Sequence, residues 1–457
     1  MSVAELGASE PEHCHLENES VEVILFYRYV PLIADEALVE RFRSWLEELR
    51  LLGRLLIAQE GFNGTLAGCR KSLLSFRQEM EREYGKIDWK CSAAADAPFP
   101  GLSVRIVGEI ISTGDHTVRK LIADQVSFDS SSFGGLSGTG IHLDPLDFHS
   151  HLLSRDKKNS LVLDIRNGFE SAVGTFNDAT HVNTVTYSQT WKKLDEILAD
   201  PARLADKETT PIYLYCTGGI RCEKASAYLL SRGAKKVYQL AGGIHRYLET
   251  MVGPIESEFV GKNFVFDARG SGMDMGGGGV GEGQGLADGD GEGDRDRDRD
   301  NGERERRSRR RGPAQVGRCL QCQQPHDKYS GLICCTVCHQ PTLVCPSCVS
   351  INPHPGEYHC SHHLWLKHCY FAILDGFTDS ELEAQLQALT CLWDDLLLLK
   401  AKGRNRRRTV ERQRQRVELE LKTRSGGDKD KDKDKVEQPI DHKNHKSRSS
   451  RWGFWRD

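Results

Sequence analysis

A chain of 457 residues is too long for one ordinary hydrophobic core, so we expect two or three folded units joined by linkers. Apolar residues make up 38% of the chain and charged residues 28%, and the polar residues gather in a few segments, which excludes one uniformly folded domain. The net charge of -4 excludes a global attraction to nucleic acid, and the absence of a signal peptide or a long apolar run predicts a soluble, cytoplasmic protein with no membrane partner.

After a polar segment over residues 1–20, which we expect to be disordered, residues 21–112 alternate between strand and helix patterns. The strands are predicted at Val21–Val30, Leu55–Ala58, Thr65–Ala67 and Leu102–Ile111, and the helices at Ala34–Leu52 and Ser72–Tyr84. This order predicts a ferredoxin-like α+β domain. Asn63-Gly64-Thr65 is interpreted as a hairpin turn between two of its strands.

A Gly/Ser-rich connector at 113–140 leads to a second domain at 141–269. Strands are predicted at Leu161–Ile165, Pro211–Tyr215 and Lys236–Gln239, with a helix at Arg221–Ser231. Strands that alternate with helices predict an α/β fold, a parallel sheet with helices on both faces.

The C-terminal part changes composition several times. A Gly/Arg/Asp-rich linker is expected at 270–316, a Cys/His module at 317–372, an amphipathic helix at 373–400 and a basic, largely disordered tail at 401–457. The Arg-rich tracts 304–311 and 404–416 have three readings that stay open: phosphate-backbone binding, a nuclear address, or solvated charge.

Cys216 is the candidate catalytic residue, because it directly follows a buried strand and directly precedes a helix. Backbone N–H groups and the positive end of the helix dipole can stabilise a thiolate or a persulfide there. The cradle is formed by the residues that follow the cysteine: Thr217, Gly218, Gly219, Ile220 and Arg221.

The loop places four residues between Cys216 and Arg221, one fewer than the phosphate-binding loop of cysteine phosphatases, and the smaller ring suits one sulfur atom. Cys222 is interpreted as an inward-packing helix residue, with a resolving thiol as the alternative. Asp164 and Arg166 end a strand and are interpreted as supporting residues that organise the fold through hydrogen bonds.

Several segments together carry a family resemblance. Asp164-Ile-Arg166 with Glu170, the Cys216 loop and residues 241–244 resemble a rhodanese domain. More specifically, IAQEGFNGT (57–65), CTGGIRCEKA (216–225) and KNFVFDAR (262–269) resemble the tRNA uridine hydroxylase family of rhodanese-like proteins. Phe62, the long linker and the basic tail depart from the family pattern.

The resemblance implies hydroxylation of the wobble uridine of tRNA with molecular oxygen, with Cys216 as the essential cysteine and tRNA as the partner. The chain shows no flavin or nicotinamide signature and no evident iron site, so the sequence leaves the activation of oxygen open. A sulfurtransferase that takes a small sulfur donor and a non-catalytic zinc and RNA adaptor are the alternative hypotheses.

Most of the 15 cysteines lie in the Cys/His module at metal-ligand spacing. The spacing gives four ligand pairs: Cys319 and Cys322, Cys335 and Cys338, Cys345 and Cys348, Cys360 and His363. These pairs predict two structural, four-coordinate zinc sites, paired either sequentially or in an interleaved way. Cys334, His354, His362 and Cys369 compete as ligands, and a reactive redox cluster is the alternative.

Overall fold

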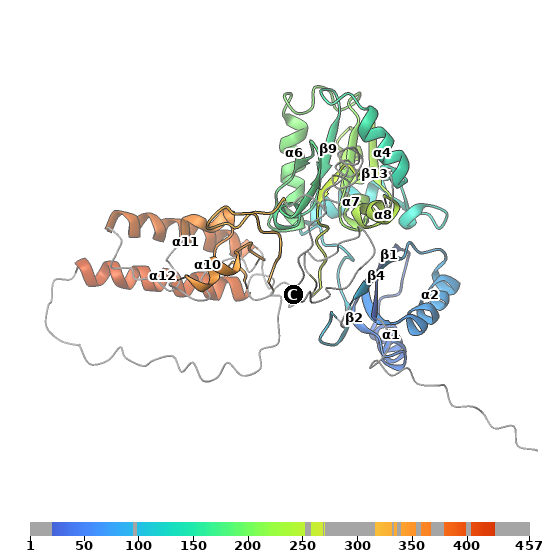
Figure 1. Cartoon of the computed structure of the whole chain (residues 1–457), viewed down its shortest axis with the longest axis horizontal. Helices are drawn as coiled ribbons and strands as arrows, with labels where there is room; N and C mark the ends of the chain where they lie inside the picture. The colour runs from blue at the N-terminus through green and yellow to red at the C-terminus, as the bar shows by residue number, and fades with distance from the viewer. Residues whose placement is uncertain are drawn as a thin grey trace, which may run out of the picture.

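The computed structural model describes residues 21–94, 98–251, 257–267, 269, 316–330, 333–335, 340–352, 358–366, 379–398 and 404–425 (Figure 1). The described residues form two sheet-containing domains, a C-terminal Cys/His region and a pair of long helices. The predicted terminal segment 1–20 and nearly all of the predicted linker 270–316 lie outside the described residues.

The N-terminal domain is a five-stranded sheet in the order β4-β1-β3-β2-β5. Its elements are β1 (Val21–Tyr29), α1 (Glu36–Glu48), β2 (Leu52–Ala58), β3 (Gly61–Cys69), α2 (Arg70–Tyr84), β4 (Lys90–Ala94) and β5 (Leu102–Ile106). The β2–β5 pair is parallel and the other pairs are antiparallel. The predicted ferredoxin-like order of strands and helices is confirmed.

Both helices of this domain cover one face of the sheet. Phe42 of α1 and Phe76 of α2 are buried against Phe26 of β1 and Phe62 of β3. Because side chains alternate between the two faces of a strand, the neighbours of these residues along each strand point to the opposite face. That opposite face is directed toward the second domain.

The predicted hairpin turn at Asn63-Gly64-Thr65 is wrong. All three residues lie inside β3, which pairs with both β1 and β2, and the actual turn falls at residues 59–60. Gly64 is a packing position, since a Cβ atom there would lie 2.5 Å from the Phe26 ring. In the sequence, a glycine such as Gly64 that makes room for an aromatic ring looks the same as a glycine that allows a turn.

The second domain contains a five-stranded parallel sheet in the order β11-β9-β12-β13-β8. Its strands are β8 (Ile141–Leu143), β9 (Leu161–Asp164), β11 (Thr180–His181), β12 (Ile212–Tyr215) and β13 (Val237–Leu240). Its helices are α4 (Pro145–Ser154), α5 (Gly168–Ser171), η2 (Tyr187–Gln189), α6 (Thr190–Ala199), α7 (Ile220–Ser231) and α8 (Gly243–Thr250). A two-stranded ribbon of β10 (Gly174–Phe176) and β14 (Phe259–Gly261) adjoins it.

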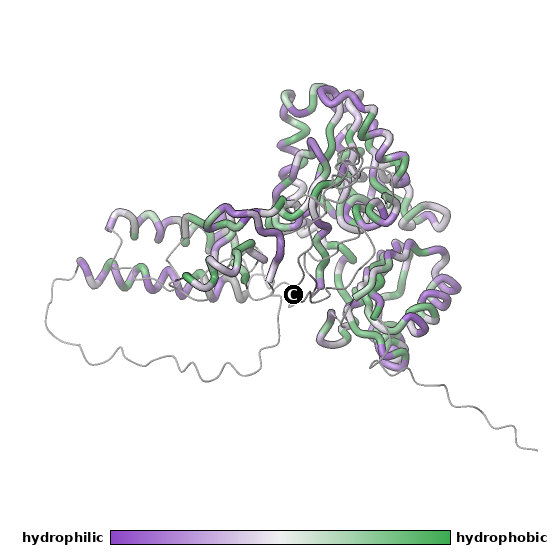
Figure 2. The backbone as a smooth tube through the Cα atoms, in the orientation of Figure 1, coloured by the Kyte–Doolittle hydropathy of each residue, from purple (hydrophilic) through white to green (hydrophobic). Residues whose placement is uncertain are grey.

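Helices cover both faces of this sheet, as predicted. Leu163 and Leu214 are buried with α6 and α7 on one face, whereas Tyr213 and Tyr215 are buried with α4 and α8 on the other. The strands are therefore apolar on both sides, as expected for a buried parallel sheet. In Figure 2 the strands of this domain are mostly hydrophobic, while α12 is mostly hydrophilic.

The connector predicted at 113–140 contains regular structure that the sequence analysis did not expect. It forms α3 (His116–Gln125), η1 (Phe133–Gly135) and a small ribbon of β6 (Ser127–Phe128) and β7 (Leu136–Ser137). The Asp115 side chain caps α3 by accepting the backbone N–H of Val118. Ile122 then anchors the helix in the core beside α7.

The C-terminal region contains the short helices α10 (Pro346–Ser350) and η3 (Ser361–Leu366) and the long helices α11 (Asp379–Leu398) and α12 (Arg404–Ser425). Within 373–400, where we expect an amphipathic helix, the structure forms α11, and α12 lies at the start of the tail 401–457, which we expect to be largely disordered. Leu382, Leu389 and Leu396 of α11 pack with Val410 and Val417 of α12, so the two helices form a hairpin (Figure 1). None of the helices in the described parts of the chain has the length and apolarity needed to cross a membrane.

Candidate active site and metal-ligand clusters

Cys216 lies at the carboxyl end of β12, and α7 begins four residues later at Ile220. Its side chain is fully buried, with 0% exposure, and its Sγ accepts the backbone N–H of Gly219 at 3.1 Å. Gly219 has a φ of +99°, which L-residues with a side chain rarely adopt. The glycine thus allows the backbone to curl around the sulfur.

The environment of Cys216 favours the thiolate. Burial alone raises the pKa of a thiol, but the Cys222 thiol, the Arg221 charge and the backbone N–H groups of Arg221 and Gly219 outweigh it and lower the pKa of Cys216 to about 5. At neutral pH the sulfur is therefore ionised and nucleophilic.

Cys222 is also fully buried and belongs to the core beside the loop. Burial and the hydrogen bond to Cys216 raise the pKa of Cys222 well above the ordinary value of a thiol. Cys222 therefore stays protonated and donates its S–H to the Cys216 thiolate.

Arg221 is held in a buried ion pair with Glu170. The two guanidinium nitrogens donate to the two carboxylate oxygens at 2.6 and 2.7 Å, and Thr217 Oγ1 donates to the same carboxylate at 3.0 Å. Glu170 therefore ties both ends of the cradle to α5. Only the family resemblance pointed to Glu170, although its capping box with Asn167 is a local signal in the sequence.

Asp164 and Arg166, the predicted supporting residues, form a second fully buried ion pair, with a distance of 2.6 Å. Asp164 accepts hydrogen bonds from Tyr215 and Ser171, and Arg166 donates to the backbone oxygen of Gly174. These contacts fasten β9 to β12 and β10 behind the cradle.

The N-terminal domain covers the Cys216 loop. A Cβ atom added at Gly218 would lie 2.9 Å from Leu25 Cδ2, and one added at Gly219 would lie 3.0 Å from the Tyr27 hydroxyl. Tyr27 donates a hydrogen bond of 2.9 Å to Glu223 of α7. The site is thus closed by side chains of β1, a contribution that the sequence analysis missed.

A buried lysine links the two domains beside the β1 side chains that cover the Cys216 loop. Lys224 Nζ lies 2.9 Å from Glu60 Oε1 and 2.9 Å from Glu109 Oε1, and it donates to the backbone oxygen of Ile111 at 3.0 Å. Because Lys224 follows the cradle within the first turns of α7, this contact fixes the N-terminal domain against the loop.

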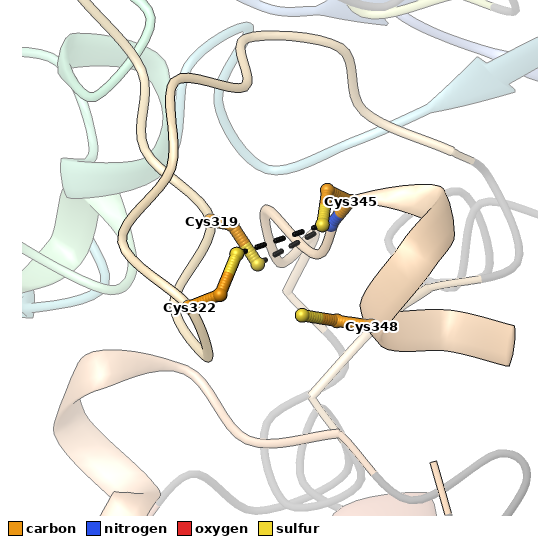
Figure 3. A group of neighbouring side chains, drawn as sticks. All are labelled: Cys319, Cys322, Cys345 and Cys348. Carbon is orange, nitrogen blue, oxygen red and sulfur yellow. Dashed lines mark hydrogen bonds between the residues drawn. The ribbon is translucent and has the colours of Figure 1, made fainter. Parts of the chain in front are cut away.

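The first and third predicted ligand pairs come together in one cluster. The sulfurs of Cys319, Cys322, Cys345 and Cys348 all lie within 4.8 Å of one another and point toward a common centre (Figure 3). Cys322 Sγ and Cys345 Sγ are 3.7 Å apart. Four thiols at this separation have the donor chemistry of a closed tetrahedral zinc site.

Members of the second and fourth pairs form another cluster, which corresponds to the interleaved pairing. His363 Nδ1 lies 3.2 Å from Cys360 Sγ and 3.6 Å from Cys335 Sγ. Among the described residues this group includes neither Cys334 nor His362. Cys338, His354 and Cys369 lie outside the described residues.

The Cys/His module packs directly behind the cradle. The Tyr329 hydroxyl donates to the backbone oxygen of Phe169 at 2.7 Å, and its ring packs on Phe169 and Phe264. Phe169 precedes Glu170, and the Arg221 guanidinium lies 5.8 Å from the Phe266 ring centre. An aromatic cluster therefore connects the module to the Glu170–Arg221 pair.

Comparison with known proteins agrees with this architecture. Residues 21–110 match the UPF0176 acylphosphatase-like domain, and residues 149–250 match the rhodanese-like domain. A rhodanese-like domain protein from Staphylococcus aureus covers 23% of this chain and 90% of its own at 20% identity, with a TM-score of 0.19, which is too low to carry weight.

Longer matches come from proteins named tRNA uridine(34) hydroxylase. The protein from Nitrobacter winogradskyi is 34% identical over 255 residues, which is 54% of this chain and 90% of the relative. The protein from Bradyrhizobium diazoefficiens is 36% identical over 259 residues, which is 55% of this chain and 92% of the relative. This chain belongs to the tRNA uridine(34) hydroxylase family.

Proposed function

We propose that this protein is an enzyme that hydroxylates a uridine of tRNA and that Cys216 is its essential residue. The observation that carries the proposal is the buried Cys216 thiolate, held in a cradle of backbone N–H groups in a chain of this family. Hydroxylation replaces a C–H bond of the base by C–OH. When molecular oxygen is the oxidant, its second oxygen atom leaves as water, which requires an external two-electron reductant.

The source of the oxygen atom provides a test. Cells that lack the endogenous enzyme and express this protein are grown under ¹⁸O₂, and their tRNA nucleosides are analysed by mass spectrometry. We expect a uridine derivative that contains one ¹⁸O atom. If no oxygenated uridine formed, the hydroxylase function would be wrong, and a new oxygen without label would show that molecular oxygen is not its source.

A sulfurtransferase is the second candidate, and the size of the cradle favours it. The loop donates the Gly219 N–H to the Cys216 sulfur and is one residue shorter than the phosphate-binding loop of cysteine phosphatases, so a persulfide on Cys216 also fits the site chemically. Cyanide-dependent formation of thiocyanate from thiosulfate, lost in Cys216→Ser, would support this function over hydroxylation.

We also propose that the two Cys/His clusters bind structural zinc. The four-thiol donor set and the Cys335, Cys360 and His363 set are typical of such sites, and so short a segment needs metal to stabilise its fold. Metal analysis of the purified protein should give two zinc ions per chain, falling to one in Cys322→Ser. Cys391→Ser, which removes an exposed cysteine of α11, is the matched control. A protein that folds without zinc would contradict the proposal.

A further inference from the structure

A row of hydrogen bonds runs from the Cys216 loop to a partly exposed histidine. The Tyr27 hydroxyl lies over the loop, 3.0 Å from the position of a Cβ atom at Gly219, and it donates to Glu223 Oε1 at 2.9 Å. The same Glu223 oxygen lies 3.0 Å from His142 Nε2. Three polar groups therefore follow one another, from Tyr27 through Glu223 to His142.

Burial decreases along this row toward the histidine. Tyr27 is 4% exposed and Glu223 is 0% exposed, whereas 19% of the His142 side chain is exposed. His142 lies on β8, an edge strand of the parallel sheet, and its ring packs on Phe133 with 5.0 Å between the ring centres. His142 can therefore exchange protons with solvent and connects the two buried groups to it.

The contact between Glu223 and His142 contains a proton. A carboxylate oxygen and an unprotonated ring nitrogen both present lone pairs, so a separation of 3.0 Å requires a hydrogen on one of them. Among the residues that the structure describes, His142 is the basic side chain that forms an ion pair with Glu223. Because a buried carboxylate without compensation is costly, the shared proton stabilises Glu223.

The two cations nearest to the row have other partners. Lys90 Nζ lies 5.0 Å from the Tyr27 ring centre and is paired with Asp88 at 2.7 Å. Arg28, the neighbour of Tyr27 on β1, donates to two backbone oxygens of the segment before η1. Neither cation replaces the histidine as the partner of the buried carboxylate.

Gln239 provides hydrogen bonds that suit more than one protonation state. Its side-chain nitrogen lies 3.1 Å from Glu223 Oε2, 3.0 Å from His142 Nε2 and 3.0 Å from the backbone oxygen of Gly140. That nitrogen carries two hydrogens. It can donate to Glu223 and Gly140 while the shared proton is present, and to His142 and Gly140 after the proton has moved on.

The Tyr27 hydroxyl can pass a proton on toward the loop. Burial and the neighbouring Glu223 carboxylate raise the pKa of Tyr27 well above the ordinary value of a phenol, so its oxygen keeps a proton at neutral pH. A hydroxyl both donates and accepts, and its hydrogen can rotate. When Glu223 gives a proton to the Tyr27 oxygen, the hydroxyl can give its own hydrogen to a group bound at the loop.

The proposed hydroxylation consumes protons at this buried place. One atom of molecular oxygen is inserted into the C–H bond of the base, and the other takes up two protons and two electrons from an external donor, such as a thiol, to form water. Cys216 is fully buried, and its thiolate has no proton to give. A positioned proton donor typically contributes about 10²- to 10⁴-fold to the rate of such a step.

We propose that His142, Glu223 and Tyr27 form a proton relay that carries protons from solvent to the Cys216 loop. The relay rests on the proposed hydroxylase function. In each passage His142 takes one proton from solvent and gives one to Glu223, Glu223 gives one to Tyr27, and Tyr27 gives one to the oxygen atom that leaves as water. Every relay group ends with the number of protons with which it began.

The test measures the rate at which purified full-length protein forms oxygenated uridine in an extract of cells that lack the enzyme. The extract supplies tRNA and the reductant. His142→Ala should slow the reaction by roughly 10²-fold. Added imidazole should restore the rate, because it can enter the partly exposed space beside Glu223 and carry protons there. A histidine that only holds the fold together would not be replaced by a free imidazole.

Two further variants locate the defect. Tyr27→Phe interrupts the row next to the loop, so it should be slow and should not respond to imidazole. His151→Ala is the matched control, because His151 of α4 also hydrogen-bonds a tyrosine hydroxyl, that of Tyr213 at 3.2 Å, but lies outside the row. It should react at the wild-type rate with and without imidazole.

Glu223→Gln keeps the test decisive if His142→Ala does not fold. The amide has the shape of the carboxylate but cannot carry a proton, so the reaction should again be slow. A folded His142→Ala or Glu223→Gln that reacts at the wild-type rate overturns the relay. A folded His142→Ala that stays slow at every imidazole concentration also overturns it.

The relay and the proposed function fail in different ways. Oxygenated uridine formed at the wild-type rate by the relay variants would refute the relay and leave the hydroxylase function intact. A wild-type protein that forms no oxygenated uridine would refute the hydroxylase function and, with it, the reaction that the relay serves.

Discussion

The charge on the Cys216 sulfur depends on groups in the loop that follows it and in the first turn of α7. Gly219 donates its backbone N–H to the sulfur, Cys222 donates its thiol, and Arg221 contributes positive charge from its pair with Glu170. The Cys222 and Arg221 side chains can be replaced separately, so the contribution of each to the pKa of Cys216 can be measured.

Removing the Cys222 thiol should raise the pKa of Cys216. A hydrogen bond to a charged acceptor contributes about 1.5 kcal/mol, or about one pKa unit, so in Cys222→Ala the thiolate fraction near pH 5 to 6 should fall. The pH dependence of Cys216 alkylation by iodoacetamide, followed by peptide mass spectrometry, measures this change. Wild type should show a midpoint near pH 5, matching the pKa of about 5, and the control Cys91→Ala should be unchanged. An unchanged midpoint in Cys222→Ala would show that Cys222 only fills space.

Glu170→Gln should destabilise the protein strongly, because it leaves the buried Arg221 charge without its partner. Breaking a buried pair typically costs about 3 to 5 kcal/mol, which should lower the unfolding midpoint of the domain by roughly 10 °C. The control Glu196→Gln breaks an exposed pair with Lys193 and should have almost no effect. Equal midpoints for the two variants in thermal unfolding would contradict this view of Glu170.

The sequence predicts those parts of the site whose residues lie close together along the chain. Cys216, Gly219 and Arg221 lie within six positions, and their spacing already indicates a thiolate cradle. The partner of Arg221 is 51 positions away, and Tyr27 is 196 positions from Glu223. Contacts at such separations depend on the tertiary fold and leave no local pattern.

Among the elements, the Cys/His module and α5 meet at a contact close to the cradle. Tyr329 joins the module to Phe169, and Phe169 is followed directly by Glu170. The docking of the module is therefore expected to affect the region that holds Arg221.

Tyr329→Phe keeps the ring but removes its hydrogen bond to the Phe169 oxygen. One such bond contributes about 1 kcal/mol, so the amides around residues 169–171 and 326–330 should exchange about fivefold faster with deuterium. Tyr238→Phe is the control, since the Tyr238 ring stacks on Tyr213 and its hydroxyl has no hydrogen bond to the described residues. Unchanged exchange in Tyr329→Phe would show that ring packing alone docks the module.

Strong periodicity made most elements predictable, and the errors have physical causes. The alternation of strands with helices in residues 141–269 and the amphipathic pattern near α11 predicted these elements. Asn63-Gly64-Thr65 was misassigned because a packing glycine resembles a turn glycine. The highly charged α12 was expected to be disordered, yet apolar contacts of Val410 and Val417 with α11 place it in a hairpin.

In the whole molecule, identifiable contacts link the module, the hairpin and the two sheet domains. Cys335 and Cys360 share an apolar cluster with Leu382 and Val410, so the metal-ligand cluster and the helical hairpin form one unit. The two sheet domains are held together by other contacts, which include those of Lys224, Tyr27 and the ion pair of Arg246 with Asp88. The interleaved ligand pairing and these contacts between domains could not be read from spacing, because they depend on how separate segments fold together.

Chelation should therefore loosen the C-terminal unit and spare the sheet domains. Limited proteolysis with and without a zinc chelator should release fragments from the Cys/His module and the hairpin, while a core of about residues 21–267 persists. Equal sensitivity of both parts would contradict a structural role of zinc confined to the module.

If Cys216 is the essential residue of a tRNA uridine hydroxylase, its replacement should abolish the oxygenated uridine. Nucleoside mass spectrometry tests this on tRNA from cells that lack the endogenous enzyme and express wild type or Cys216→Ser at equal levels. We predict a uridine that has gained one oxygen atom with wild type and none with Cys216→Ser. The same oxygenated uridine in both, with both proteins folded, would contradict the assignment of Cys216.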